Sequence, residues 1–283
     1  MFLRPSDRPE APDGVPEALW TAVQQADRVL YERCGDRLIG DEEEDEQARF
    51  EELCHSRWGQ LANSDDALVA ARERLYEADR PMFRAKFQKG LEERHRALAG
   101  PLAILRNAGE EGVPHLALAM TTDTWASILA VELLAELPAG PLRDKALVES
   151  VFLPGDWAPE AGERAAGTIP LERRWSLFEA EAREAHRAGI ELQSLYWTSL
   201  FEEGPGDETD RRPTRDLERA TALLYDLGHH SALVAGLGFL LDLAVSGPER
   251  VHRNLKDGNL ERVLATIAQR PPALRPNRPP ISG

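Results

Sequence analysis

The chain has 283 residues, of which 42% are hydrophobic and 29% are charged, and its formal net charge is −15. This apolar content excludes a chain that is disordered throughout and is typical of a globular protein with one large domain or two small ones. A body this acidic repels the nucleic-acid backbone, so the composition argues against nucleic acid. The charge indicates either a basic protein partner or solubility alone, and both interpretations stay open.

The composition also bears on where the protein works. Two cysteines, Cys34 and Cys54, are too few for a disulfide framework and indicate reduced thiols in the cytoplasm. The first residues contain no apolar run that would serve as a signal peptide. The most apolar stretch, 231–245, contains Asp242 and is too short to cross a membrane. Only four of the 34 basic residues are lysines, which indicates a GC-rich bacterial genome.

The N-terminal part begins with a predicted flexible arm, residues 1–14, which carries three prolines and a glycine among charges. A helix is predicted from Pro16 to about Gly35. The next predicted helix runs to about Ala62 and has an apolar face that includes Leu61. It opens with six consecutive carboxylates, Asp41, Glu42, Glu43, Glu44, Asp45 and Glu46.

Two interpretations of this acidic run stay open. Acidic residues in a first turn stabilise the positive end of the helix dipole, so the run is explained as a solvated helix start. The same carboxylates also form a candidate binding surface for a basic partner. A calcium loop is a poor match, because the run lacks the spaced oxygen ligands and the glycine of such loops.

Shorter elements follow. Ser64 or Asp65 is the predicted N-cap of a helix that Pro81 ends, and a further helix is expected to close at Gly100. Beyond Pro101, glycine and proline turns separate short helical stretches. Those stretches are 102–106, 114–120, a helix capped by Thr121 or Thr122 and ending before Pro138, and 142–152.

Residues 154–168 are the predicted loop or linker between an N-terminal half, 15–153, and a C-terminal half, 169–269. Trp157 lies in this segment. An aromatic side chain on a loop is either an anchor for a partner or a lid folded back over the core. Both interpretations remain open from the sequence.

The C-terminal half starts with the longest helical pattern, from Pro170 toward Glu203, and Gly189 is expected to bend or split it. Helices over 214–228, 229–245 and 259–269 follow. The tail, 270–283, has five prolines and is not expected to join a packed core. Residues 249–283 have seven basic and three acidic side chains, a charge of +4, and Arg275 and Arg278 of the tail are candidate partner-binding residues.

The predicted fold is therefore all-α, with about ten to twelve helices in a multi-helix bundle or in irregular stacked helical hairpins. No fixed repeat period connects the elements, so a regular repeat array is not established. Hardly any stretch alternates in the way a strand requires.

One group of residues suggests catalysis. Glu52 and His55 are three positions apart on one predicted helix, the Glu-x-x-His spacing of carboxylate-bridged di-iron bundles. Asp226 and His230 are four apart and could supply further ligands, although Gly228 lies between them. Two-residue matches of this kind are frequent in a chain with 49 acidic residues. A helical metalloenzyme of the di-iron type is kept as the alternative hypothesis.

The favoured hypothesis is a non-enzymatic, acidic helical interaction protein of the bacterial cytoplasm, without a cofactor. It would act as a subunit of an assembly, or as an inhibitor or immunity-type protein that binds a basic partner in a defence locus. The candidate binding residues are the acidic run 41–46, Trp157, Arg275 and Arg278.

Overall fold

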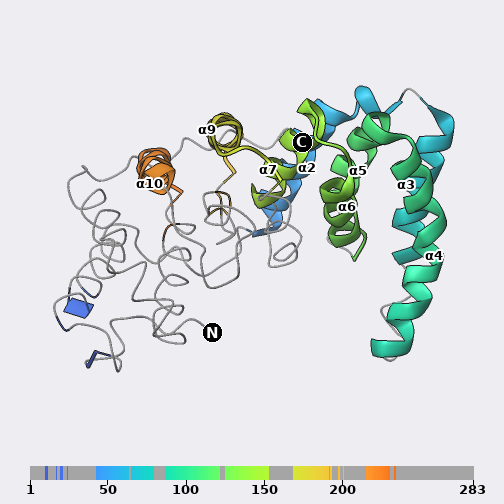
Figure 1. The fold of residues 1–283 in the computed structure, drawn as a ribbon, viewed down its shortest axis with the longest axis horizontal. Coiled ribbons are helices and arrows are strands. Elements are labelled where there is room, and N and C mark those ends of the chain that lie inside the picture. The colour runs from blue at the N-terminus through green and yellow to red at the C-terminus, as the bar shows by residue number, and fades with distance from the viewer. Residues whose placement is uncertain are drawn as a thin grey trace. The chain divides into compact units, whose positions relative to one another are not determined.

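The described part of the chain is helical. The computed structural model describes residues 10–11, 17, 20–21, 24, 43–63, 65–79, 87–121, 125–152, 168–190, 192, 197, 200, 215–229 and 233. These residues contain eight α-helices and no strand (Figure 1), which confirms the all-α prediction for them. Eight is fewer than the predicted ten to twelve, and the predicted helices over 229–245 and 259–269 lie almost wholly outside the described residues.

The chain divides into two compact units. The central unit is Glu44–Pro170, and the terminal unit combines Met1–Glu43 with Leu171–Gly283. The predicted division into halves 15–153 and 169–269 stays a prediction, because most of residues 15–43 and of the predicted linker lie outside the described residues. Of the predicted linker, 154–168, only Thr168 is described.

Helix α2, Glu43–Trp58, faces the core of the central unit with a single stripe. Phe50, Cys54 and Trp58 are four residues apart and buried, as the 3.6-residue period requires. The sequence analysis extended this face to Leu61, which is wrong. The α-helix ends at Trp58, and Leu61 begins the short 3₁₀ helix η2, Leu61–Asn63, where it is 48% exposed.

Helix α3, Asp66–Asp79, begins at a side-chain cap. The Asp65 carboxylate accepts hydrogen bonds from the backbone N–H groups of Ala67 at 2.7 Å and Leu68 at 3.4 Å. These bonds satisfy donors that have no partner within a first helical turn. Asp65, one of the two predicted capping residues, therefore acts as the N-cap.

Helix α4, Phe87–Asn107, contradicts the prediction that a helix closes at Gly100, because it continues through Pro101. An internal proline removes one backbone hydrogen bond and normally kinks or ends a helix. Here Leu98, Pro101 and Leu105 are buried at helical spacing, so packing stabilises the continued helix. Helix α4 lies beside α3 (Figure 1).

The centre of the same unit is built from shorter helices. After η4, Gly109–Gly112, come α5, Val113–Met120, and α6, Trp125–Glu136. Residues 138–140 are not helical, as their proline and glycine predict, and Pro141 then occupies the first turn of α7, Pro141–Glu149. A 3₁₀ helix, η5, continues over Ser150–Phe152. Helix α5 packs against α3, α4, α6 and α7.

The terminal unit contains α9, Leu171–Arg187, and α10, Arg215–Leu227, packed against each other. Both helices end at a glycine with positive φ, Gly189 at 72° and Gly228 at 80°. The N–H of Gly189 bonds to the carbonyl of His186, and that of Ile190 to Ala185, the Schellman pattern. Gly189 therefore ends the helix that was expected to run toward Glu203.

Aromatic and basic side chains join the elements of this unit. Phe178 of α9 stacks on Trp197 at 6.4 Å between ring centroids. The Arg219 guanidinium of α10 lies 4.1 Å from the centroid of Trp175 on α9, within the range of a cation–π interaction. Arg174 is buried and donates to the Leu200 carbonyl at 2.8 Å. The contacts of Trp197 and Leu200 hold the connection after α9 against that helix, and the Arg219–Trp175 contact joins α9 to α10.

None of the helices in the described ranges combines the length and the apolar character that crossing a bilayer demands.

Candidate functional site

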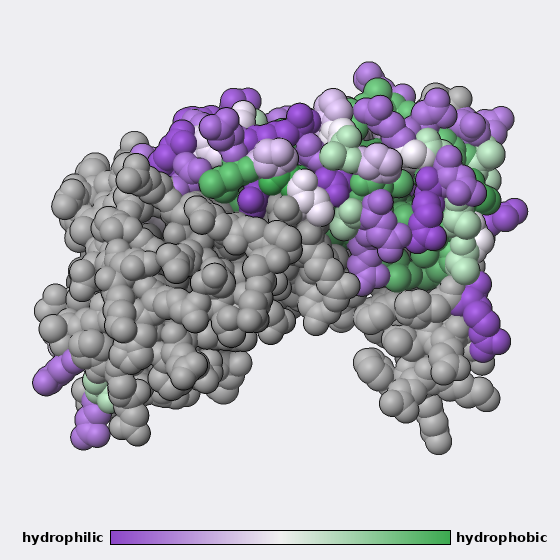
Figure 2. Space-filling model, viewed as in Figure 1, coloured by the Kyte–Doolittle hydropathy of each residue, from purple (hydrophilic) through white to green (hydrophobic). Residues whose placement is uncertain are grey.

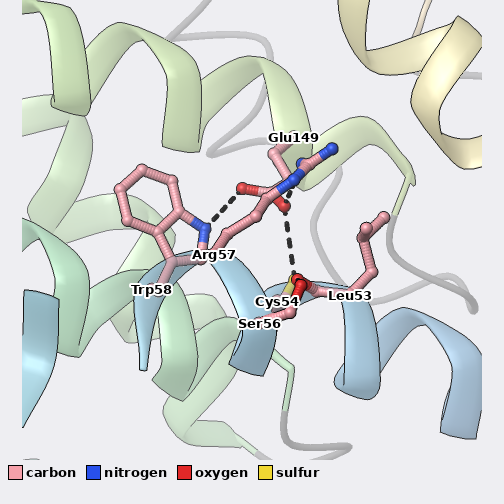
Figure 3. Close-up of polar contacts among 6 residues, drawn as sticks. All are labelled: Leu53, Cys54, Ser56, Arg57, Trp58 and Glu149. Atoms are coloured by element: carbon pink, nitrogen blue, oxygen red, sulfur yellow. Dashed lines mark hydrogen bonds and ion pairs between the residues drawn. The ribbon is translucent and has the colours of Figure 1, made fainter. Parts of the chain in front are cut away.

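A buried group of polar contacts surrounds Glu149, at the end of α7 (Figure 3). Its side chain is only 1% exposed. One carboxylate oxygen, Oε1, accepts from Arg57 Nη1 at 2.7 Å and from Cys54 Sγ at 3.4 Å. The other, Oε2, accepts from Trp58 Nε1 at 2.7 Å. We call these four residues the Glu149 cluster.

The geometry of α2 explains why three of its residues meet one carboxylate. Positions three and four apart lie on the same side of a helix, and Cys54, Arg57 and Trp58 have that spacing. Ser56 belongs to the opposite, exposed side and donates to the Leu53 carbonyl of its own helix at 2.8 Å (Figure 3). Lys145, one turn before Glu149 on α7, has its Nζ 5.8 Å from the Trp58 ring centroid.

The hydrogen bonds and ion pair of the Glu149 cluster connect two helices. A buried carboxylate is tolerated when it is paired and its lone pairs are satisfied, and here a guanidinium, an indole and a thiol do this. A carboxylate oxygen can only accept a hydrogen bond, so the Cys54 side chain must be the donor. The contact therefore requires Cys54 to be a protonated thiol. Both oxygens are committed to α2, so the arrangement joins α2 to α7 rather than presenting a reactive acid to a substrate.

A second buried charge performs a similar task in the central unit. Arg143 of α7 is 3% exposed. It donates to the carbonyls of Leu134 at 3.1 Å and Ala135 at 3.0 Å, in the last turn of α6, where carbonyls run out of regular helical donors. The Leu134 carbonyl also accepts from the Leu137 N–H at 3.3 Å. Its other contacts are Asp144 at 3.0 Å and the Thr168 hydroxyl at 2.6 Å. Arg143 therefore caps α6 and holds Thr168 near it.

The terminal unit brings two histidines together where α9 and α10 end. The rings of His186 and His229 are edge-on, with centroids 6.4 Å apart. His229 is buried, and its Nδ1 accepts from the Leu192 backbone N–H at 2.8 Å. An accepting nitrogen carries no proton, so the neutral ring holds its proton on Nε2. A metal at Nε2 would have to displace that proton, which makes the pair a poor metal site.

The structure describes only part of the predicted partner-binding set. Glu43, Glu44, Asp45 and Glu46 form the first turn of α2, as the acidic-start interpretation predicts for a helix N-terminus. Asp41, Glu42, Trp157, Arg275 and Arg278 lie outside the described residues.

The alternative metal set is divided between the two units. Glu52 and His55 are exposed on α2 in the central unit, whereas Asp226 is exposed near the end of α10 in the terminal unit. Helix α10 ends before Gly228, so Asp226 and His230 do not share a continuous helix, and His230 lies outside the described residues. Within the described ranges, no group of three or more His, Cys, Asp or Glu side chains is arranged to hold a metal ion.

Sequence reasoning missed the buried polar residues of the central unit. Glu149 and His115 are each the only ionisable side chain in a largely apolar stretch, 147–152 and Val113–Met120 respectively. That contrast is a signal, because an isolated ionisable residue in an apolar run has to be paired, neutral or exposed. The signal marks the residue but does not reveal its partner.

Comparison with known proteins adds no family. The chain matches no protein-family model, no curated protein and no solved structure.

Proposed function

We propose that this chain is a non-enzymatic protein of the bacterial cytoplasm that binds a basic protein through its acidic outer surface. The main support is a difference between buried and exposed charged side chains of the described helices. Buried charges such as Glu149 and Arg143 connect one helix to another. The outer faces keep an excess of acid, in a chain with 49 acidic and 34 basic residues.

The central unit shows this excess by itself. It has 22 acidic and 14 basic residues between Glu44 and Pro170, a net charge of −8. On the face drawn in Figure 2, hydrophilic residues alternate with hydrophobic ones over the described helices. Acidic side chains exposed on this unit include Asp66, Glu73, Glu110, Glu111 and Glu132. Such a surface offers both charge complementarity and apolar area to a partner.

Charge and buried area would contribute differently to binding. An acidic surface raises the association rate with a basic protein and makes that rate depend on salt, whereas packing at the centre of the interface sets the lifetime of the complex. The acidic run 41–46 is the densest negative charge in the chain and the proposed first point of encounter. An assembly subunit and an inhibitor or immunity-type protein both fit this chemistry.

The test compares two neutralised variants of the full chain. In the first, Asp41 and Asp45 become Asn, and Glu42, Glu43, Glu44 and Glu46 become Gln. The second variant removes the same charge from six other exposed positions of the acidic surface, and so compares the acidic run with the rest of that surface; these positions are Asp66, Glu73, Glu110, Glu111, Glu132 and Glu172. A partner captured from bacterial lysate is purified, and its association rate is measured from 50 to 500 mM KCl.

We expect the first variant to associate about tenfold more slowly at low salt, since electrostatic steering changes rates by roughly 10 to 1,000-fold. The association rate of the second variant should fall by a smaller factor. Association that is indifferent to salt and equal in all three proteins would contradict the proposal. A purified chain that holds a metal stoichiometrically and turns over a substrate would favour the metalloenzyme instead.

A further inference from the structure

Helix α5 is the most enclosed element that the structure describes. All eight of its side chains, from Val113 to Met120, are buried, and seven of them are apolar. The exception is His115, whose exposed fraction is 0%. Helices α3, α4, α6 and α7 pack around α5, so this imidazole lies in the core of the central unit.

The His115 ring has no hydrogen-bond partner. Neither Nδ1 nor Nε2 is bonded, although both atoms are removed from solvent. A neutral imidazole has one donor and one acceptor, and a protonated one has two donors. Leaving either form unpartnered in a core is unfavourable, and the cost is far greater for the charged form.

The charges that act on the ring come from the start and middle of α3. Burial lowers the pKa of His115 from its ordinary value of 6.5, the Arg72 guanidinium lowers it further, and the Asp65 carboxylate opposes them more weakly. Asp65 is also engaged as the N-cap of α3. The ring is therefore neutral in the folded unit at pH 7.

The other elements around α5 do not offset a charge on this ring. Helix α7 contributes Arg143, Asp144 and Glu149, which bond to one another or to α2 and α6, and Lys145, whose Nζ lies over the Trp58 ring; none of them bonds to His115. The charged side chains described on α4, η4 and α6 point outward and are exposed, namely Arg96, Arg106, Glu110, Glu111, Glu132 and Glu136.

We propose that His115 makes the central unit sensitive to acid, because the folded core holds the ring neutral and the proton taken up at lower pH is accommodated only when α5 separates from α3. The predicted consequence is a central unit that loosens in mildly acidic surroundings and closes again at neutral pH. This inference stands independently of the proposed partner.

The sign of the effect follows from proton linkage. Below pH 6.5 the opened chain binds a proton at His115 that the folded unit resists, so the opened state gains stability as the pH falls. Above pH 6.5 neither state binds this proton and the effect vanishes. One such proton changes the opening equilibrium by at most tenfold per pH unit.

The experiment measures amide hydrogen exchange of α5 in the full chain from pH 7.5 to 5.5, corrected for intrinsic exchange. Two variants are compared with the wild type, His115→Leu and the control His55→Leu, which removes an exposed histidine from α2. In the wild type and the control, we expect protection of α5 to fall by up to tenfold per pH unit below 6.5. In His115→Leu, we expect the protection of α5 not to fall in this way below pH 6.5. Its protection at pH 7.5 should be higher than in the wild type, because the substitution removes two unpartnered nitrogens.

A wild type and a His115→Leu variant with the same pH slope would overturn the proposal. A direct measurement covers the case in which the variant does not fold. Nitrogen NMR of the wild-type imidazoles should show His115 still neutral at pH 6 in the folded protein. A charged His115 ring in the folded protein at that pH would overturn the proposal as well.

Discussion

Glu149 shows how a single side chain can determine the arrangement of two helices. Its partners lie 91 to 95 residues earlier in the chain, and all of them belong to α2. Replacing one member of a buried ion pair leaves the other charge in the core without compensation. The Glu149 cluster is therefore the place in the central unit where a conservative substitution should have its largest effect.

The first prediction concerns this pair. Glu149→Gln keeps the shape of the side chain but removes the charge opposite Arg57, and we expect the free energy of unfolding to fall by about 3–5 kcal/mol. Urea denaturation measures the change. The matched control is Glu136→Gln, which breaks the pair with Arg106, where the side chains are 59% and 55% exposed. That loss should be only about 0–1 kcal/mol. Equal losses would show that the Glu149 cluster is no more than a surface contact.

Residue by residue, the sequence predicted what depends on neighbours along the chain. The cap at Asp65 and the buried stripe Phe50, Cys54 and Trp58 follow from local spacing, and both are present. The partner of Glu149 could not be predicted, because the pairing depends on which helices meet. The partner-binding residues Trp157, Arg275 and Arg278 remain predictions.

At the scale of elements, helix ends divide into those that local chemistry sets and those that packing overrides. Gly189 and Gly228 end α9 and α10 because each takes a left-handed conformation that side chains with a Cβ rarely adopt. Gly100 and Pro101 look like an equally strong stop in the sequence, yet α4 continues through both. Burial of Leu98, Pro101 and Leu105 on one face decides that case.

The second prediction tests this distinction among glycines. Gly189→Ala and Gly228→Ala each force a Cβ into a left-handed backbone, and we expect each to destabilise the fold by roughly 1–2 kcal/mol. Gly100→Ala, within α4, meets no atom within 4 Å outside its chain neighbours, so a gain in helix propensity of about 0.5–1 kcal/mol should outweigh the crowding of the new Cβ by the Pro101 ring. If backbone φ is the cause, thermal unfolding should show a lower melting temperature for the first two variants and a higher one for Gly100→Ala. Three changes of the same sign would contradict this account.

At the scale of the whole molecule, net charge acts on folding as well as on partner choice. A chain with a charge of −15 repels itself, and the repulsion is stronger in a compact state than in an extended one. Salt screens this repulsion, because the Debye length shrinks from roughly 30 Å at 10 mM to about 8 Å at 150 mM.

The third prediction follows from this screening. Raising NaCl from 10 to 150 mM should increase the melting temperature of the full chain by about 2 °C or more, as expected for a gain near 1 kcal/mol in a protein of this size. The variant neutralised at 41–46 carries six fewer negative charges and should gain less. Scanning calorimetry measures both. A melting temperature that falls with salt would indicate that attractive pairs outweigh the net repulsion.

The sequence by itself determined the helical class, most described helix positions and the acidic character of the surface, because each follows from local periodicity or from composition. Only the tertiary structure decided that α2 meets α7 at Glu149, that α4 passes through a proline, and that His115 is sealed in the core. Those outcomes depend on contacts between residues far apart in the chain. Spacing along one helix shows which face is apolar, but it does not show what covers that face.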